Sequence, residues 1–258
     1  MALPTYSHRL AALGSWYVPR HIGRHFHAVR CDRDGLPPVI SGPTVFFMNH
    51  ASWWDPLIGA LFVARRYAKY RHYTPIDAQA VRKYPIMLKF GFFSIDKNPR
   101  RGAAQFLEIS REVLHTPDAV MWLTPEGRFR DIRVRPVQLR PGIGHLAALC
   151  PEVRLVPIAI EYTFWQESLP EAIVRFGQGV SAKDHPDLSP ADWTAHLAVE
   201  LQGEMDALAE NVKARDASAF DLVQRGREGV GGIYDLIRRG KALATGRPFL
   251  PAHEQEQP

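Results

Sequence analysis

The feature of this sequence that most restricts the fold is a short apolar run that leads directly into a helical pattern. Thr44–Met48 is largely apolar, follows the turn-forming pair Gly42-Pro43 and predicts a buried strand. Beyond the next few residues apolar side chains recur at helical spacing, so a helix follows at once. In α/β sheets built from such units, ligands bind outside the carboxyl ends of the strands. His50 stands at that end of the predicted strand, and Asp55 falls in the first turn of the helix.

His50 and Asp55 are the residue types of a catalytic base and its partner. A carboxylate that binds one imidazole nitrogen leaves the other nitrogen able to take a proton, so the pair can deprotonate a hydroxyl. A structural interpretation fits the same residues, because Ser52-x-x-Asp55 is also a capping box and His50 can make a structural hydrogen bond. The stretch by itself leaves both interpretations open.

Three later motifs extend the pattern, and together they carry a resemblance to a known family. His50-x4-Asp55, preceded by Asn49 and followed by Pro56, is similar to the first motif of the glycerolipid acyltransferases, the lysophosphatidic acid acyltransferase family. The remaining motifs of that family are matched, in the same order, by Gly91–Lys97, Leu123–Gly127 and Val156–Ile160.

The resemblance implies an α/β fold, with a mixed central β-sheet flanked by helices and an N-terminal helical element. It implies an enzyme that moves a fatty acyl group from a thioester to a hydroxyl of a lysophospholipid or related lipid. The thioester is acyl-coenzyme A or acyl-acyl carrier protein, and neither a cofactor nor a metal is expected. His50 would take the proton from the acceptor hydroxyl, Asp55 would orient His50, and no covalent acyl-enzyme forms.

The substrate-binding candidates lie at predicted strand ends and in the loops that follow them. They are Asn49, Lys97, Arg100, Glu126, Gly127, Arg128 and Arg130.

The third motif departs from the family pattern in a way that affects the acceptor. After Glu126-Gly127 the chain has Arg128-Phe129, where the family has Thr-Arg, so the arginine expected to hold the acceptor's phosphate is Arg128 or Arg130. Further arginines follow at positions 133 and 135, and in an extended segment arginines two residues apart, such as Arg128 and Arg130, would share one face. An acceptor without phosphate, such as a glycosylated or isoprenoid lipid, stays an alternative.

Charge and cysteine content narrow the function classes. A net charge of +5 indicates an anionic partner, which can be a nucleic acid, an anionic lipid or an acidic carrier protein. Nucleic acid is not expected, because no recognised binding motif occurs. The two cysteines show no metal-like spacing. A hydrolase that uses the same dyad on water is the second enzymatic hypothesis.

The chain length suits one α/β domain with additions at both ends. We predict an N-terminal helical element in residues 1–38, the acyltransferase domain in residues 39–216, and a basic helical extension with a polar tail in residues 217–258.

The N-terminal element is the first candidate for membrane contact. Tyr6–Val29 is interpreted as one or two short helices broken at Pro19, with Trp16 among basic residues, as at a membrane interface. A helix that packs on the core with a solvated basic face fits equally well. No signal peptide and no transmembrane segment are expected. The predicted location is therefore peripheral, on the cytoplasmic face of the membrane.

Overall fold

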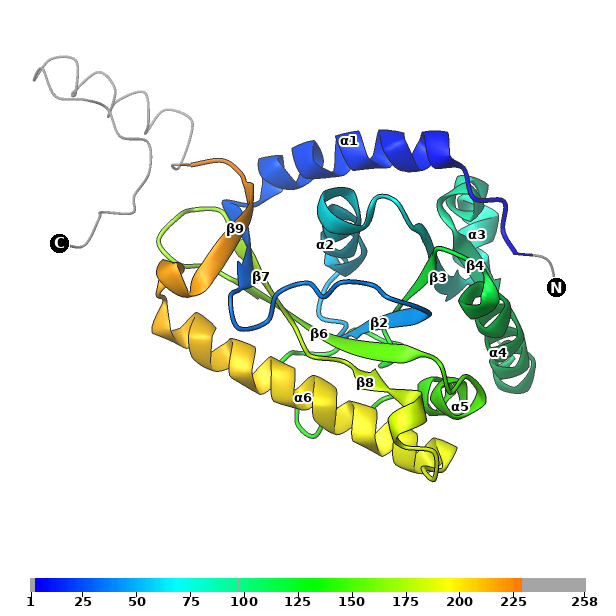
Figure 1. The fold of residues 1–258 in the computed structure, drawn as a ribbon. Coiled ribbons are helices and arrows are strands. Elements are labelled where there is room, and N and C mark those ends of the chain that lie inside the picture. The colour runs from blue at the N-terminus through cyan, green and yellow to red at the C-terminus, as the bar shows by residue number, and fades with distance from the viewer. Residues whose placement is uncertain (1–2, 97, 229–258) are drawn as a thin grey trace, which may run out of the picture.

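The computed structural model describes residues 3–96 and 98–228. Within that part of the chain, nine strands form one sheet with the order β4-β3-β5-β2-β6-β7-β1-β9, and β8 pairs with β6 (Figure 1). The strands are β1 (Ala28–Asp32), β2 (Thr44–Met48), β3 (Arg71–Asp77), β4 (Phe92–Ile95), β5 (Ala119–Leu123), β6 (Arg154–Thr163), β7 (Glu171–Phe176), β8 (Val180–Ser181) and β9 (Phe220–Arg225).

The sheet is mixed, and its parallel part positions the site. β4, β3, β5, β2 and β6 run parallel to one another, whereas β7, β8 and β9 each pair antiparallel to a neighbour. The carboxyl ends of the five parallel strands therefore meet at one edge, where ligands bind in sheets of this kind. The predicted α/β class with a mixed sheet flanked by helices is confirmed.

Helices cover both faces of the sheet. The helices are α1 (His8–His25), α2 (Asp55–Phe62), α3 (Ala78–Lys83), α4 (Pro99–His115), α5 (Gly142–Leu149) and α6 (Pro190–Ala214), with the π-helix η1 (Val63–Tyr67) and the 3-10 helices η2 (Pro85–Phe90), η3 (Ala182–Asp184) and η4 (Ala217–Ala219). None of these described helices has both the length and the apolar content needed to cross a membrane.

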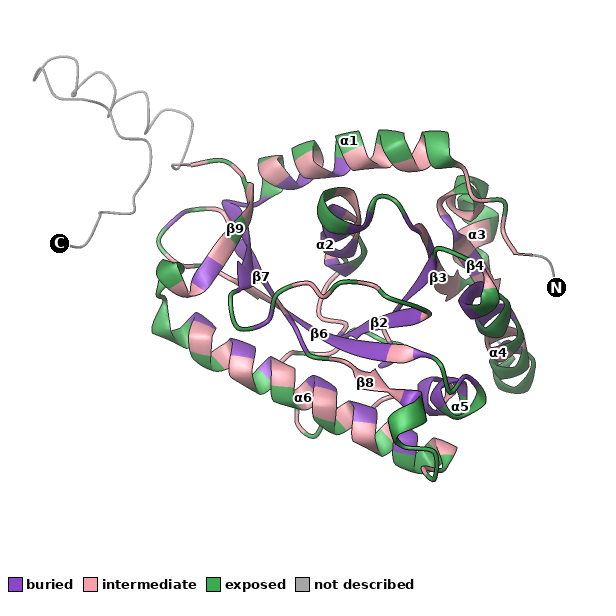
Figure 2. Ribbon diagram, viewed as in Figure 1, coloured by how far each residue is buried: buried purple, intermediate pink, exposed green. Residues whose placement is uncertain are grey.

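The two faces of β2 show how the core divides. All five residues of β2 are buried. Val45 and Phe47 belong to the cluster that α4, α5 and α6 cover, and Phe46 and Met48 belong to the cluster that α1 and α2 cover. Figure 2 shows the central strands almost wholly buried, the strands at the edges of the sheet partly buried, and the outer sides of the helices exposed. A strand that is buried on both faces has apolar side chains at successive positions. The apolar run in the sequence therefore marks the whole strand, and β2 has the predicted bounds.

The predicted break at Pro19 is wrong. α1 is one helix of 18 residues with Pro19 inside it. Proline removes one helical hydrogen bond, but packing of the apolar side of a helix can outweigh that loss. Here Val18 and Ile22 are buried in the cluster shared with α2, and α1 lies across α2 (Figure 1).

The sheet extends beyond the predicted 39–216 segment at both ends. β1 lies within residues 1–38, and it pairs with β7 and with β9, which follows residue 216. Phe220–Arg225 is therefore a strand, where a basic helical segment was expected. The rest of that expected segment, from residue 229 onward, lies outside the described residues.

Gly144 lets α5 approach α6 closely. A Cβ built at Gly144 would lie 2.1 Å from the Pro190 carbonyl oxygen and 2.2 Å from Thr194 Oγ1. Contacts this short require the two helices to separate. The neighbours of Gly144 on α5 line the largest cleft described below. The glycine therefore sets the position of one wall of that cleft.

We expect Gly144→Ala to lower the free energy of unfolding by about 1–3 kcal/mol through overpacking. The control is Gly203→Ala in α6, where an added Cβ would have no atom within 4 Å. That change should raise stability by roughly 0.5–1 kcal/mol, because alanine favours helix over glycine. Urea denaturation measures both variants, and an equal effect of the two would contradict the close approach.

Candidate active site

The turn between β2 and α2 brings His50 and Asp55 together as predicted. His50 Nδ1 lies 2.7 Å from Asp55 Oδ2. The Asp55 side chain is fully buried, while 19% of the His50 side chain is exposed. With Asp55 ionised, Nδ1–H donates to the carboxylate, so Nε2 carries the lone pair. No described residue hydrogen-bonds Nε2, and His50 lines the cleft described below.

Asp55 accepts from two further donors. The Ser52 backbone N–H donates to Oδ2 at 3.0 Å, and the Tyr162 hydroxyl donates to Oδ1 at 2.7 Å. The Ser52 contact is half of the expected capping box, so the carboxylate holds the helix start and the imidazole at once. Burial, followed by the charge and hydrogen bond of Asp55, raises the pKa of Tyr162 well above its usual range. Its hydroxyl therefore stays protonated and able to donate.

Sequence reasoning missed Tyr162, although a signal for it exists. On β6, Ile158 and Ile160 pack in the cluster under α2, and Tyr162 packs against the same cluster. Residues two apart on a strand share a face, so the alternation after the fourth motif places Tyr162 under the start of α2.

Asn49 has a different role from the predicted one. Its side chain donates from Nδ2 to the Ile160 carbonyl at 3.0 Å and accepts at Oδ1 from the Ile160 N–H at 2.8 Å. Only 1% of the residue is exposed. Both ends of the amide are thus occupied by β6, and Asn49 fixes the end of β2.

Glu126 supports the backbone of His50. Its Oε2 accepts from the His50 N–H at 2.7 Å, and its Oε1 lies 3.9 Å from Arg130 Nε. The Arg130 N–H in turn donates to the His50 carbonyl at 2.9 Å. The loop after β5 therefore holds both sides of the peptide at the strand end. Glu126 was predicted as a substrate-binding residue, and these contacts show it ordering the His50 backbone and lying near Arg130.

Gly127 is required by its backbone and by Arg140. Its φ of 65° lies in the left-handed region, and an added Cβ would lie 2.0 Å from Arg140 Nε. Arg140 donates to the Gly127 carbonyl at 3.1 Å and, from its backbone N–H, to the Pro125 carbonyl at 2.8 Å. Arg140 is thereby held beside Gly127, at the wall of the cleft.

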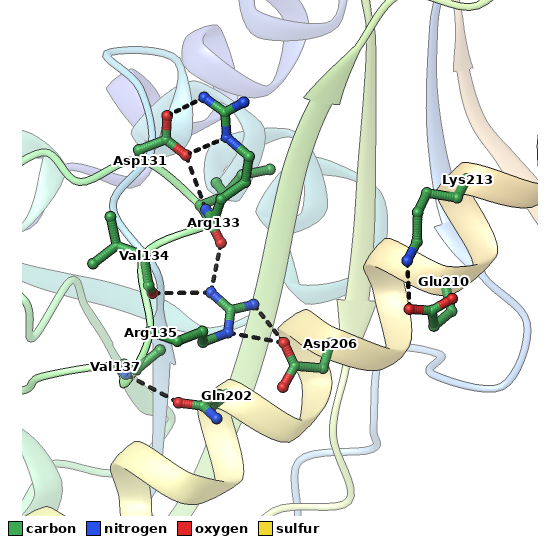
Figure 3. A network of polar contacts seen from close by, with 10 residues as sticks. Asp131, Arg133, Val134, Arg135, Val137, Gln202, Asp206, Glu210 and Lys213 are labelled. Carbon is green, nitrogen blue, oxygen red and sulfur yellow. Dashed lines mark hydrogen bonds and ion pairs between the residues drawn. The ribbon is translucent and has the colours of Figure 1, made fainter.

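The arginines after Gly127 do not share one face as predicted. No strand forms at residues 128–135, and the side chains of Arg133 and Arg135 take separate partners (Figure 3). Arg133 pairs with Asp131, and Arg135 pairs with Asp206 on α6. Arg130 donates to Gln138 at 3.0 Å, and Arg128 is exposed. The alternation indicated an extended segment, but local carboxylates and a neighbouring helix bend the loop instead.

A cleft of about 1130 Å³ opens at the carboxyl ends of β3, β4, β5 and β2. Its apolar lining comes mainly from α4, α5 and the strand ends, and His50, Gly127 and Arg140 lie at its polar side. The apolar side chains are Ile76, Ile95, Ala103, Phe106, Leu107, Leu123 and Ile143. The Phe129 ring lies beside the imidazole of His50, with ring centroids 4.3 Å apart and the ring planes tilted by 43°.

Of the two basic candidates near the start of α4, only Arg100 can be placed relative to the cleft. Arg100 is exposed in the first turn of α4 and is not among the lining residues, and Lys97 lies outside the described residues. Across the described ranges, no three residues among His, Cys, Asp and Glu come together as a metal site.

Comparisons with known proteins agree on one family. The family model described as "Acyltransferase" matches residues 15–161. The crystal structure of the 1-acyl-sn-glycerophosphate (LPA) acyltransferase PlsC from Thermotoga maritima superposes with a TM-score of 0.52 at 13% sequence identity, covering 81% of each chain. At that identity the similarity shows a shared fold. No curated protein matches the chain.

We expect Tyr162→Phe to lower the free energy of unfolding by about 1–3 kcal/mol, because it leaves a buried carboxylate oxygen without its donor. Tyr84→Phe is the control, since Tyr84 is 52% exposed and its change should have almost no effect. Urea denaturation at neutral pH gives both values. Equal stability of the Tyr162→Phe variant and the parent would show that the hydroxyl does not support Asp55.

Proposed function

The chain belongs to the acyltransferase family, and from this premise we propose that it transfers a fatty acyl group from an acyl thioester to a hydroxyl of a lipid acceptor. The resemblance carried by the four motifs is confirmed for the family and the fold. The observation that carries the proposal is the pairing of His50 with buried Asp55 at 2.7 Å, at the mouth of a cleft lined with apolar side chains.

In the proposed reaction His50 acts as the general base. Its Nε2 takes the proton of the acceptor hydroxyl as the hydroxyl oxygen attacks the thioester carbonyl. The C–O bond of the new ester forms, the C–S bond breaks, and the proton passes from Nε2 to the departing thiolate. Asp55 orients the imidazole and stabilises its charged form, and Tyr162 and Ser52 hold Asp55 in place.

The dimensions and lining of the cleft suit an acyl chain. The apolar residues from α4, α5 and the strand ends can cover its methylene groups, which favours binding by about 0.8 kcal/mol for each CH₂ group that is buried. Phe129 lies beside the imidazole and adds apolar surface next to the base. This arrangement favours transfer to a lipid hydroxyl over hydrolysis, which stays the second candidate.

For the acceptor we propose a phosphate-bearing lipid, held by Arg140. Arg140 is the one arginine among the described residues that line the cleft. Arg128 is exposed outside the lining, and Arg130 is engaged by Gln138 and lies near Glu126. A lysophospholipid thus stays the preferred acceptor. The positive charge that binds its phosphate would come from Arg140, whereas the sequence suggested Arg128 or Arg130.

The donor is acyl-coenzyme A or acyl-acyl carrier protein, and the enzyme acts at the membrane surface that holds its acceptor. Attachment is peripheral, on the cytoplasmic face. The exposed basic side of α1 supports this proposal.

We expect His50→Ala to reduce turnover by about 10²–10⁴-fold, because the general base is lost. Asp55→Asn should cost less, since the base remains with a poorer partner. His115→Ala is the matched control, as His115 is exposed at the end of α4, and it should retain full activity. A folded His50→Ala enzyme that keeps more than about a third of the parent turnover would refute the role of the dyad.

The same assay separates transfer from hydrolysis. Release of free fatty acid is measured with and without a lysophospholipid. Transfer predicts an acylated acceptor and slow release of fatty acid in its absence, whereas a hydrolase would release fatty acid equally fast in both reactions.

We expect Arg140→Gln to raise the Michaelis constant for a lysophosphatidic acid acceptor by roughly 10–150-fold, the effect of losing a contact of about 1.5–3 kcal/mol to a charged group. The constant for the donor should change little. Arg128→Gln, which removes the same charge outside the cleft, is the control and should leave both constants nearly unchanged. If Arg128→Gln raised the Michaelis constant for the acceptor more than Arg140→Gln did, the phosphate would be held by Arg128, as the sequence suggested.

A further inference from the structure

The outward side of α1 combines apolar and cationic side chains. Three large apolar residues there are exposed, Leu13 at 56%, Trp16 at 56% and Tyr17 at 47%. Arg9, Arg20 and Arg24 are exposed at helical spacing among them, and α1 contains no acidic residue. Figure 2 shows this side of α1 as exposed and the side toward α2 as buried. Such a helix suits an anionic membrane interface, where the aromatic and apolar groups insert and the arginines reach the headgroups.

A small hollow beside this helix contains two arginines. It has a volume of about 380 Å³ and is lined by Ser15, Pro19, Arg20, Arg65 and Gln224, which come from α1, η1 and β9. Arg65 belongs to the π-helix η1. Single-turn π-helices are uncommon and frequently occur at functional sites.

Neither arginine has a carboxylate partner among the described residues. Arg65 donates to Gln224 Oε1 at 2.6 Å, and Arg20 donates to the Trp16 carbonyl at 2.7 Å. The Arg20 guanidinium also lies 4.3 Å from the centre of the Trp16 ring. Each guanidinium has five N–H groups, so most of its donors stay available to a ligand.

The lining also offers an acceptor to the same ligand. Pro19 has no N–H, so the Ser15 carbonyl lacks the helical donor that it would otherwise have. A phosphodiester headgroup with a hydroxyl would match this lining, because its phosphate oxygens accept from the guanidiniums and its hydroxyl can donate to a carbonyl.

We infer that the hollow formed by Arg20 and Arg65 binds the phosphate of an anionic phospholipid and fixes α1 on a bilayer. The inference rests on the proposed function in one respect, namely that the acceptor lipid is taken from a membrane. It assigns the attachment to a defined site in addition to the general charge of the N-terminal segment.

Aromatic contacts join α1 to the turn that carries the dyad. Trp54, which directly precedes Asp55, lies beside His21 and His25 of α1, with ring centroids 5.7 Å and 5.2 Å away. The adjacent Trp53 is 72% exposed and meets Trp54 edge to face. Exposed apolar surface thus occurs both on α1 and in the turn that carries the dyad. A bilayer bound at α1 lies close to where the acceptor must enter.

The test is flotation of the full chain with vesicles of phosphatidylcholine alone and of phosphatidylcholine with phosphatidylglycerol. We expect binding to the anionic vesicles, and about 30-fold weaker partitioning for Arg20→Gln/Arg65→Gln, since each basic residue near the surface contributes about 1 kcal/mol. The control Arg111→Gln/Lys183→Gln removes the same charge from exposed positions on α4 and η3 and should bind like the parent. Circular dichroism verifies that both variants are folded.

Equal losses in the two double variants would reduce the attachment to net charge and overturn the site. Equal binding of the parent to both vesicle types would also overturn it. Displacement of the parent from anionic vesicles by millimolar inorganic phosphate would identify a site for free phosphate instead. Acyl transfer is measured separately with a detergent-dissolved acceptor, in which the Arg20→Gln/Arg65→Gln variant should keep the parent rate. Loss of flotation therefore stays distinguishable from a failure of the proposed reaction.

Discussion

The site depends on satisfying one carboxylate with hydrogen-bond donors in a place that water does not reach. Asp55 is fully buried, and an ion in such a position is stable only when its oxygens accept hydrogen bonds or face a partner charge. The donors come from three parts of the chain: the end of β2 through His50, the turn through Ser52, and β6 through Tyr162. Satisfying Asp55 therefore requires that strand, turn and neighbouring strand are all in place. The orientation of the imidazole follows from that requirement.

Hydrogen bonds to the sheet hold the backbone on both sides of His50 in place. Asn49 presents a donor and an acceptor to the backbone of Ile160, as a peptide group of β2 would. The ladder between β2 and β6 thus continues past the last strand residue up to the residue before His50. Glu126 then takes the His50 N–H, so the segment that leaves the sheet remains held from both sides. If His50 is the base, as we propose, an imidazole held in this way loses little freedom when a substrate binds.

The sequence allowed much of this to be predicted, because the decisive signals are local. The strand, the turn and the start of the helix around His50 follow one another within a dozen residues. The apolar run of β2 is too short for a helix, so the sequence favours a strand there. Contacts between distant segments were not predictable in the same way. Tyr162 reaches Asp55 only because β6 pairs with β2, and Arg140 reaches Gly127 only because the intervening loop folds back. The predicted extended segment of arginines was wrong for the same reason. Asp206, the partner of Arg135, lies 71 residues away on α6, and the local sequence does not indicate that contact.

The packing of His21 and His25 of α1 on Trp54 makes the N-terminal helix part of the catalytic scaffold. A membrane anchor that is joined to a domain by a flexible linker can be replaced by another anchor without changing the packing of that domain. Here the same helix covers the residue next to Asp55 and buries Val18 and Ile22 in the core. Variation in α1 is therefore constrained on its inner side by packing on Trp54 and on the core, whereas the outward residues Leu13, Trp16 and Tyr17 are exposed. Under the proposed attachment, adaptation to a different membrane would change those outward side chains and retain the helix itself.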